Sequence, residues 1–303
     1  MPIFEFTCYH GRGDQGDWMK RVLVVDDSKP MRHFIAAGLS PHFQVEISVD
    51  GSDALERILA ESFDLLVTDL EMPGLHGFGL HREVRRWDPT LPVVLITDTD
   101  IDRWLVMAEK QDVGHIVPKA LLQADFDGFV AILQGLVMRV PFGLSHYLEP
   151  GGECRTYVLG QAAEVPAVQE KTDDIFRHFP RANIYRAVLG MLLQNALSYG
   201  IPEEGLGPGR YVTVAVGADS RRVGLAVGDP AGSLRRRELL HWLAHPTPEG
   251  SRGWGFQVLR RFMNQCLIQL REGTTSEIVC LDLLEPYQGS RPLAIYEEAR
   301  DDS

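Results

Sequence analysis

Apolar residues in the first half of the chain occur as short runs, each followed by a segment with helical spacing. Such runs, rich in Val, Leu and Ile, are typical of strands buried in a parallel sheet when they alternate with helices. The predicted strands are 21–27, 44–50, 63–69, 91–98 and 115–119, and the predicted helices are 30–39, 51–62, 79–87, 102–111 and 121–138. The pattern therefore indicates an α/β fold, a doubly wound (βα)5 domain with a parallel sheet.

The second half of the chain has a different pattern, in which helices are interleaved with strand pairs joined by polar turns. Antiparallel hairpins combined with helices are typical of an α+β sandwich. The predicted strands are 154–161, 209–219 and 221–230 with a closing hairpin over 266–284, and the predicted helices are 164–179, 183–200, 233–245 and 250–265.

Prolines and glycines between residues 141 and 152 separate the two patterns and mark a domain boundary. The predicted segments are a poorly patterned extension (1–19), the first domain (20–140), a linker (141–152), the second domain (153–287) and an acidic tail (288–303). Residues 292–303 of the tail are expected to be frayed. Met19 directly precedes the first predicted strand, so Met1 and Met19 are both candidate starts.

The composition of the 303 residues narrows the classes of function. A net charge of -12 argues against a nucleic-acid-binding surface, which needs clustered Lys and Arg. The longest apolar stretch, 126–144, is interrupted by Gln134, Arg139 and Pro141 and is too broken to span a bilayer. The four cysteines form no CxxC pair. We therefore expect a cytoplasmic protein that binds neither membrane nor nucleic acid, and the oligomeric state stays open.

Reactive side chains stand where the first domain's predicted strands end: Asp26, Asp27, Asp69, Thr97 and Lys119. The carboxyl ends of parallel strands meet at one edge of a sheet, so these side chains are expected to converge. Three carboxylates repel one another unless a cation neutralises them, and Mg²⁺ suits because it takes hard oxygen ligands. A carboxylate beside Mg²⁺ and an ammonium is suited to accept a phosphoryl group.

The segment DLEMPGLHGFGL (69–80) fits the pattern D-x-x-M-P-x-x-x-G-x-x-L. With the acidic pair, the threonine and the lysine, it resembles the receiver domain of two-component response regulators. The resemblance implies strand order 2-1-3-4-5 and phosphorylation by a histidine kinase or phosphotransfer protein. It further implies a phosphoacceptor, Asp69; Mg²⁺ ligands Asp26, Asp27, Asp69 and the Glu71 carbonyl; and switch residues Thr97 and Lys119.

Three positions depart from the usual receiver pattern. Asp98 follows the threonine where a small residue is usual, Ile116 stands where an aromatic is usual, and Pro118 precedes Lys119 where a proline usually follows. These departures put the aromatic part of the switch in question more than the phosphorylation.

In the second half, five residues indicate a nucleotide site: Asn195, Asp229, Gly232, Gly253 and Gly255. Glycines ahead of a helix let backbone N–H groups approach an anion, an aspartate can accept from an adenine amino group, and an asparagine can supply an oxygen to Mg²⁺. No GxxxxGK[ST] sequence occurs, so a Walker-type loop is not expected.

The order of these elements resembles the GHKL ATPase superfamily, and most of all its anti-sigma-factor serine kinases. The resemblance assigns Asn195 to the metal, Asp229 to adenine and the glycines to the phosphate loops. Met191 stands where the superfamily has its general-base glutamate, and DPAGS (229–233) departs from its first glycine box. Three readings stay open: a GHKL-shaped domain without nucleotide, ATP binding with little turnover, and efficient kinase activity.

These inferences predict a response regulator whose output domain acts by binding a regulatory protein, with ATP as a further candidate ligand. The alternative is an ATP-dependent serine/threonine kinase of the anti-sigma-factor type, controlled by the receiver. Two smaller signals are His241 and His245, spaced to face one side of a helix, and the basic run 235–237. They are weak indications of a metal site and of a docking surface.

Overall fold

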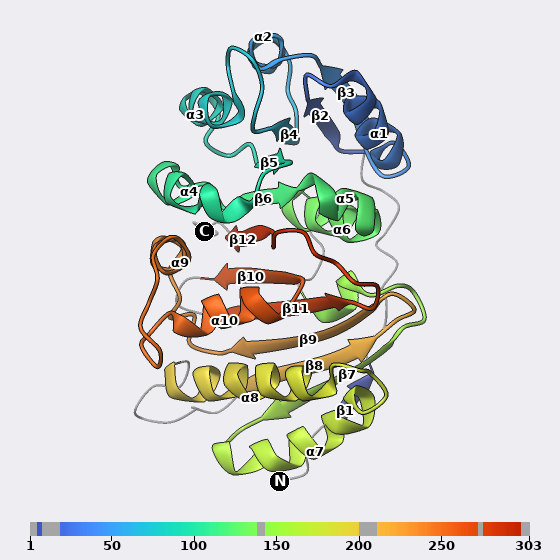
Figure 1. Ribbon diagram of the computed structural model, residues 1–303, viewed down its shortest axis with the longest axis vertical. Coiled ribbons are helices and arrows are strands. Elements are labelled where there is room, and N and C mark those ends of the chain that lie inside the picture. Colours follow the sequence, from blue (N-terminus) through green and yellow to red (C-terminus); the bar gives the residue numbers. More distant parts are fainter. Residues whose placement is uncertain (1–4, 8–18, 138–142, 200–210, 272–274, 298–303) are drawn as a thin grey trace, which may run out of the picture. The chain divides into compact units, whose positions relative to one another are not determined.

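A computed structural model describes residues 5–7, 19–137, 143–199, 211–271 and 275–297 (Figure 1). Met1 and residues 298–303 of the predicted tail lie outside these ranges. The chain forms two compact units. The N-terminal unit comprises residues 12–140 and 292–294, and the C-terminal unit comprises 1–11, 141–291 and 295–303. None of the helices in the described ranges is long and apolar enough to cross a membrane.

The N-terminal unit contains the predicted parallel sheet. Its strands are β2 (Arg21–Val25), β3 (Gln44–Ser48), β4 (Leu65–Asp69), β5 (Val93–Thr97) and β6 (His115–Pro118). They pair in the order β3-β2-β4-β5-β6, which is 2-1-3-4-5 counted along the sheet strands, so the predicted topology is confirmed. The central strands β4 and β5 are buried along their whole length, as their apolar runs predict.

The N-terminal unit's helices connect consecutive strands, as the alternating pattern predicts. They are α1 (Lys29–Leu39), α2 (Gly51–Ala60), α3 (Gly77–Trp87), α4 (Leu105–Gln111), α5 (Lys119–Ala124) and α6 (Phe126–Val137), with a 3-10 turn, η1 (Ile101–Arg103), before α4. The single helix predicted over 121–138 is two helices, because the Asp125 carboxylate accepts the backbone N–H of Gly128 and starts a new one.

A sixth strand was not predicted. Residues 292–303 were expected to fray, but Leu293–Glu297 form β12, in which Leu293 pairs antiparallel with Ile116 and Ala294 with His115. Its first four residues are buried. The prediction was wrong for this segment because LAIY is apolar and finds the free edge of β6.

The C-terminal unit is built on an antiparallel sheet. Its strands are β7 (Glu153–Leu159), β8 (Val212–Ala218), β9 (Arg222–Asp229), β10 (Gln265–Arg271) and β11 (Thr275–Leu283). They pair in the order β7-β8-β9-β11-β10. A further short strand, β1 (Glu5–Thr7), pairs with β7. The extension 1–19, in which no pattern was predicted, therefore contributes an edge strand. A strand of three residues is too short to be predicted from the sequence.

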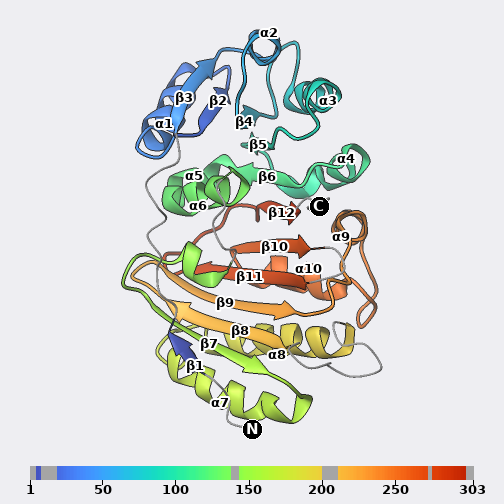
Figure 2. The same cartoon turned by 180° about the vertical axis from the view of Figure 1, so that it is seen from behind.

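Helices cover one face of this sheet. They are α7 (Val165–Phe176), α8 (Ala182–Tyr199) and α10 (Trp254–Phe262), with α9 (Arg236–Ala244) beside them (Figures 1 and 2). Two 3-10 turns, η2 (Leu144–Tyr147) and η3 (Ala162–Glu164), precede α7. Leu144 and Tyr147 are buried and Leu144 packs against Gly224 of β9, so the predicted linker 141–152 is partly packed against the sheet.

Candidate functional site

The reactive side chains of the N-terminal unit converge on Lys119. Its Nζ lies 2.8 Å from Oδ2 of Asp69, 2.9 Å from Oδ2 of Asp26 and 3.4 Å from Oδ2 of Asp98. Lys119, Asp26 and Asp69 are buried, whereas Asp98 is exposed. The convergence follows from topology, because Asp26 and Asp69 end neighbouring parallel strands and Lys119 directly follows β6.

The carboxylates of Asp26, Asp27 and Asp69 each place an oxygen within 4.8 Å of the others. Asp26 accepts the backbone N–H of Ser28 through Oδ1, while its Oδ2 meets Lys119 as an ion pair without hydrogen-bond geometry. A buried carboxylate oxygen with spare acceptor capacity beside two more carboxylates matches the ligand set of a hard divalent cation.

Burial and charge oppose each other at this cluster. Burial raises the pKa of Asp69, and the Lys119 ammonium and the Glu71 backbone N–H oppose that rise without reversing it. Burial by itself would lower the pKa of Lys119, but the hydrogen bond to Asp69 and the attraction from Asp69 and Asp26 outweigh it and raise the pKa. Lys119 is therefore a permanent cation that compensates charge on the buried carboxylates.

The tight turn after Asp69 explains why residue 77 in the 69–80 segment is a glycine. Gly77 begins α3, and a Cβ there would come 2.6 Å from the Asp69 backbone oxygen. Gly74 has φ of +74°, a conformation that side chains disfavour. Met72 is buried. These residues fold the loop tightly beneath the carboxylate and bring the Glu71 N–H to 3.2 Å from Oδ1 of Asp69.

Thr97 is fully buried at the end of β5 and belongs to a hydrogen-bond chain. Its Oγ1 lies 3.4 Å from Oε2 of Glu71 and 2.9 Å from Oγ1 of Thr99, and it accepts the Thr99 N–H at 3.0 Å. Thr99 in turn accepts the indole N–H of Trp104 at 2.7 Å. The sequence identified Thr97 and Glu71 but not Thr99 or Trp104, since neither belongs to the receiver pattern.

The three departures have visible structural outcomes. Asp98 extends the carboxylate cluster toward Lys119 at 3.4 Å. Ile116 is fully buried and pairs with Leu293 of β12. No cis peptide bond occurs in the described ranges, so Pro118 does not form the cis turn that its position before Lys119 left open.

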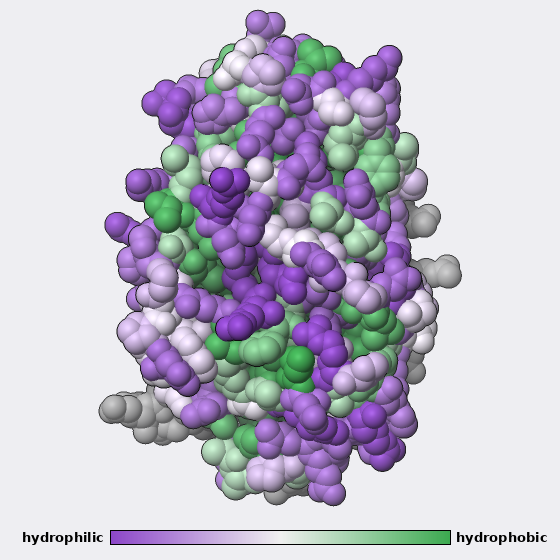
Figure 3. Space-filling view, in the orientation of Figure 1, coloured by the Kyte–Doolittle hydropathy of each residue, from purple (hydrophilic) through white to green (hydrophobic). Residues whose placement is uncertain are grey.

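The C-terminal unit holds a cavity of about 220 Å³ between α8, β9 and the start of α10. Four of the five predicted nucleotide-site residues line it: Asn195, Asp229, Gly253 and Gly255. The fifth, Gly232, donates its backbone N–H to Oδ1 of Asp229 at 3.2 Å. The space-filling view shows apolar side chains gathered near α8 and α10 within a largely hydrophilic surface (Figure 3).

Met191 and Asn195 lie side by side against the first turn of α10. A Cβ at Gly255 would meet the Asn195 amide nitrogen at 3.0 Å and the Met191 sulfur at 3.6 Å. Gly255 therefore permits close approach of α10 to α8. Met191 lines the cavity as expected from its spacing, and it brings a thioether with no proton-accepting capacity comparable to a carboxylate.

An aromatic wall of the cavity escaped the sequence analysis. Trp242 stacks on Phe256 with ring centroids 6.1 Å apart and planes 13° apart, and the Arg252 guanidinium lies 5.3 Å above Trp242. The side chain of Gln257 donates to the Trp242 and His245 carbonyls at 2.9 Å each, which holds the end of α9 against α10. Contacts between residues on two helices have no signature in either helix alone.

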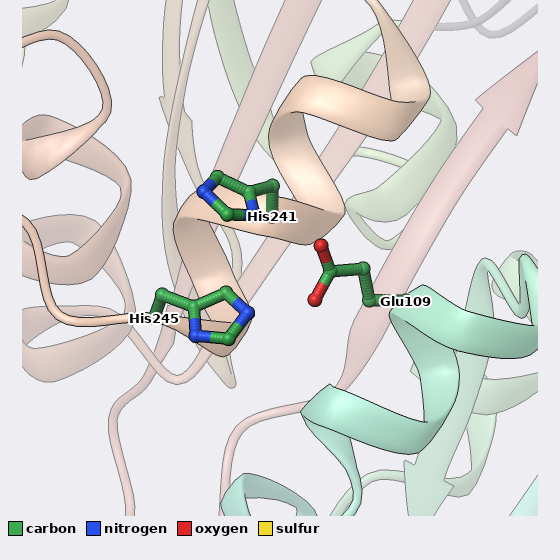
Figure 4. Close-up of side chains that lie close together, drawn as sticks. All are labelled: Glu109, His241 and His245. Atoms are coloured by element: carbon green, nitrogen blue, oxygen red, sulfur yellow. The ribbon is translucent and has the colours of Figure 1, made fainter.

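His241 lies in the last turn of α9 and His245 caps the end of that helix, one turn further along the chain (Figure 4). Their ring centroids are 4.6 Å apart and both side chains are exposed. Two imidazoles on an exposed face do not complete a tetrahedral site by themselves.

Comparison with known proteins places residues 22–128 in the response regulator receiver domain family. The receiver protein CpdR of Brucella abortus is 38% identical over 80 residues, which cover 26% of this chain and 67% of that protein. The DNA-binding transcriptional regulator NtrC of Escherichia coli is 26% identical over 181 residues, 59% of this chain. The chain spans only 36% of that regulator's length.

Among solved structures, the response regulator TrrA of Thermotoga maritima, in complex with Mg²⁺ and beryllium fluoride, is 27% identical. It matches 39% of this chain and 99% of its own, with a TM-score of 0.35. The matched residues 22–128 run from β2 to the first turn of α6 and so cover the parallel sheet described above. The chain thus belongs to the response regulators of two-component systems, through a receiver domain at residues 22–128.

Proposed function

We propose that Asp69 accepts a phosphoryl group from a histidine kinase or a phosphotransfer protein. A carboxylate oxygen of Asp69 attacks phosphorus, the O–P bond forms, and the N–P bond to the donor histidine breaks. The observation that carries this proposal is the position of Lys119, 2.8 Å from Asp69 and 2.9 Å from Asp26, with Asp27 beside them. This arrangement supplies positive charge where the transferring oxygens become negative.

Mg²⁺ fits the residues at this site. Asp26, Asp27, Asp69 and the Glu71 backbone carbonyl would hold it, and the spare acceptor capacity of Asp26 Oδ2 supports this assignment. When bound, the ion neutralises phosphoryl oxygens. Lys119 stays charged throughout, and Thr97 supplies a hydroxyl that can donate to the new phosphoryl group.

We propose further that the C-terminal unit is a GHKL-like output module that binds a regulatory protein and retains a nucleotide pocket. The neighbouring Asn195 and Gly255, the Asp229 carboxylate and the aromatic wall support adenine-nucleotide binding. Met191 argues for binding with little turnover, because general-base loss costs about 10² to 10⁴ in rate. Phosphorylation of the receiver would change the population of output states that bind the partner.

The alternative is an ATP-dependent serine/threonine kinase of the anti-sigma-factor type. The same cavity residues favour it, and Met191 opposes it. A kinase or ATPase rate that disappears in Asn195→Ala would select this alternative over the binding module. DNA binding, which the name of NtrC states for that regulator, is less favoured for this chain at a net charge of -12.

The experiment that tests phosphorylation uses the full chain with acetyl phosphate and Mg²⁺, followed by intact-mass measurement. We expect a phosphorylated species in the wild type and none in Asp69→Asn. A species of the same mass and yield in Asp69→Asn would refute the assignment.

A further inference from the structure

Trp104 is joined to the candidate switch residue by side-chain hydrogen bonds. The indole N–H can only donate, so Thr99 Oγ1 is its acceptor at 2.7 Å. The Glu71 carboxylate can only accept, so the Thr97 hydroxyl donates to it at 3.4 Å. The remaining bond, 2.9 Å between the two threonine hydroxyls, then runs from Thr99 to Thr97. All four side chains form one directed chain.

Each threonine hydroxyl in this chain has a single proton, and both protons are used. Thr97 also accepts the Thr99 backbone N–H at 3.0 Å, so its oxygen receives two hydrogen bonds and gives one. Its proton cannot point to Glu71 and to an oxygen bound at Asp69 at the same time. An anion at Asp69 that accepts a hydrogen bond from the Thr97 hydroxyl must therefore break the hydrogen bond from Thr97 to Glu71. The movement of Thr97 also disturbs its hydrogen bonds with Thr99.

Trp104 carries the disturbance to helix α4. The residue is half-buried, lies at the junction of η1 and α4, and packs on Phe78 with ring centroids 5.8 Å apart. Two residues of the following turn, Val106 and Met107, are 40% and 39% exposed. A change in the Trp104 position would thus move an exposed apolar surface.

We propose that Trp104, Thr99, Thr97 and Glu71 form a latch that holds the receiver in its unmodified state. The latch couples the surroundings of Asp69 to the start of α4. This proposal rests on the proposed function, because it concerns the control of the same phosphoacceptor site.

The test measures the affinity of the full chain for beryllofluoride, a phosphoryl mimic, with Mg²⁺ in calorimetric titrations. Trp104→Phe removes the indole N–H and keeps an aromatic ring, and Thr99→Val removes the central hydroxyl at similar volume. Because the latch stabilises only the unbound state, each variant should lower the apparent Kd about two- to tenfold, the equivalent of one hydrogen bond. The double variant should match the single variants, since each one already breaks the chain.

The matched control is Trp87→Phe, which alters a tryptophan in the same unit that is 63% exposed. Its Kd should equal that of the wild type. A second readout is tryptophan emission, which should change on beryllofluoride binding in the wild type and lose that change in Trp104→Phe.

Two results would overturn the latch, and a third would overturn the proposed function on which it rests. Unchanged or higher Kd values in Trp104→Phe and Thr99→Val would remove its energetic basis. Fully additive effects in the double variant would show two separate contacts instead of one chain. Absence of beryllofluoride binding to the wild type would instead defeat the phosphoacceptor proposal itself, and this outcome is distinct because it needs no variant.

Discussion

The receiver unit and the C-terminal unit each bring predicted reactive residues together, but the chemistry of the two sites differs. In the receiver, the carboxylates of Asp26 and Asp69 both contact the Lys119 ammonium, and all three residues lie buried. In the C-terminal cavity, the Asp229 carboxylate instead accepts the backbone N–H groups of Ala231 and Gly232, and Met191 stands beside Asn195. The two units thus compensate their carboxylates differently: a buried ammonium does so in the receiver, and backbone N–H groups do so in the cavity.

The largest expected effect is the loss of phosphorylation from the receiver unit. Asp69→Asn keeps the side-chain volume and removes the nucleophilic carboxylate, so phosphorylation by acetyl phosphate should fall by roughly 10³-fold or more. Intact-mass measurement checks it. Asp98→Asn, at an exposed position close to Lys119, should retain phosphorylation.

The next largest effect is a gain of ATP hydrolysis in the C-terminal cavity. Met191→Glu places a carboxylate one turn before Asn195, and we expect ATP hydrolysis to rise about 10²-fold over the wild-type background. Phosphate release measures the rate. Met191→Gln has similar size without the carboxylate and should show no gain. Equal rates in the two variants would contradict a GHKL-like arrangement.

A smaller effect concerns nucleotide affinity. Asp229→Asn should weaken Mg·ATP binding about tenfold or more, because a half-buried carboxylate acceptor is lost from the cavity. Calorimetric titration into the full chain measures it, with the exposed Asp174→Asn on α7 as control. If the wild type does not bind ATP at millimolar concentration, the cavity has a structural role without nucleotide binding. The functional difference between the receiver unit and the C-terminal unit is then larger.

The smallest effect concerns stability and pH. Burial raises the pKa of Glu277 on β11 to about 7, above its usual 4.5, and attraction from Arg271 only partly opposes this. The folded state therefore holds the proton more tightly, and this contribution to stability is present near pH 4.5 and is lost as the pH rises toward 7.

Glu277→Gln should accordingly stabilise the protein at pH 8 relative to the wild type by about 1 to 2 kcal/mol, discounted because the side chain retains some exposure. The two proteins should be closely matched at pH 4.5. Urea unfolding at both pH values measures this, and the exposed Glu285→Gln should change neither. A larger gain at pH 4.5 would refute the assignment of the titrating group.

The amino-acid pattern was enough to predict the receiver fold and the residues that meet at its carboxylate cluster. Apolar runs alternating with helical spacing specify a parallel sheet, and residues at the ends of neighbouring strands must then meet, which brought Asp26, Asp69 and Lys119 together. The positions of Asn195, Asp229 and the glycines in the second half followed from the same kind of local pattern, and all but Gly232 line the cavity.

Which segments complete the sheets, and which further side chains join the sites, depended on how the elements pack in three dimensions. The pairing of β1 with β7 and of β12 with β6, the link from Trp104 to Thr99, and the stacking of Trp242 on Phe256 all escaped prediction. The physical reason is common to them. Hydrophobic periodicity indicates which face of a helix or strand is buried. Which segment pairs with a free sheet edge, and which aromatic rings become neighbours, depends on how separate elements pack together.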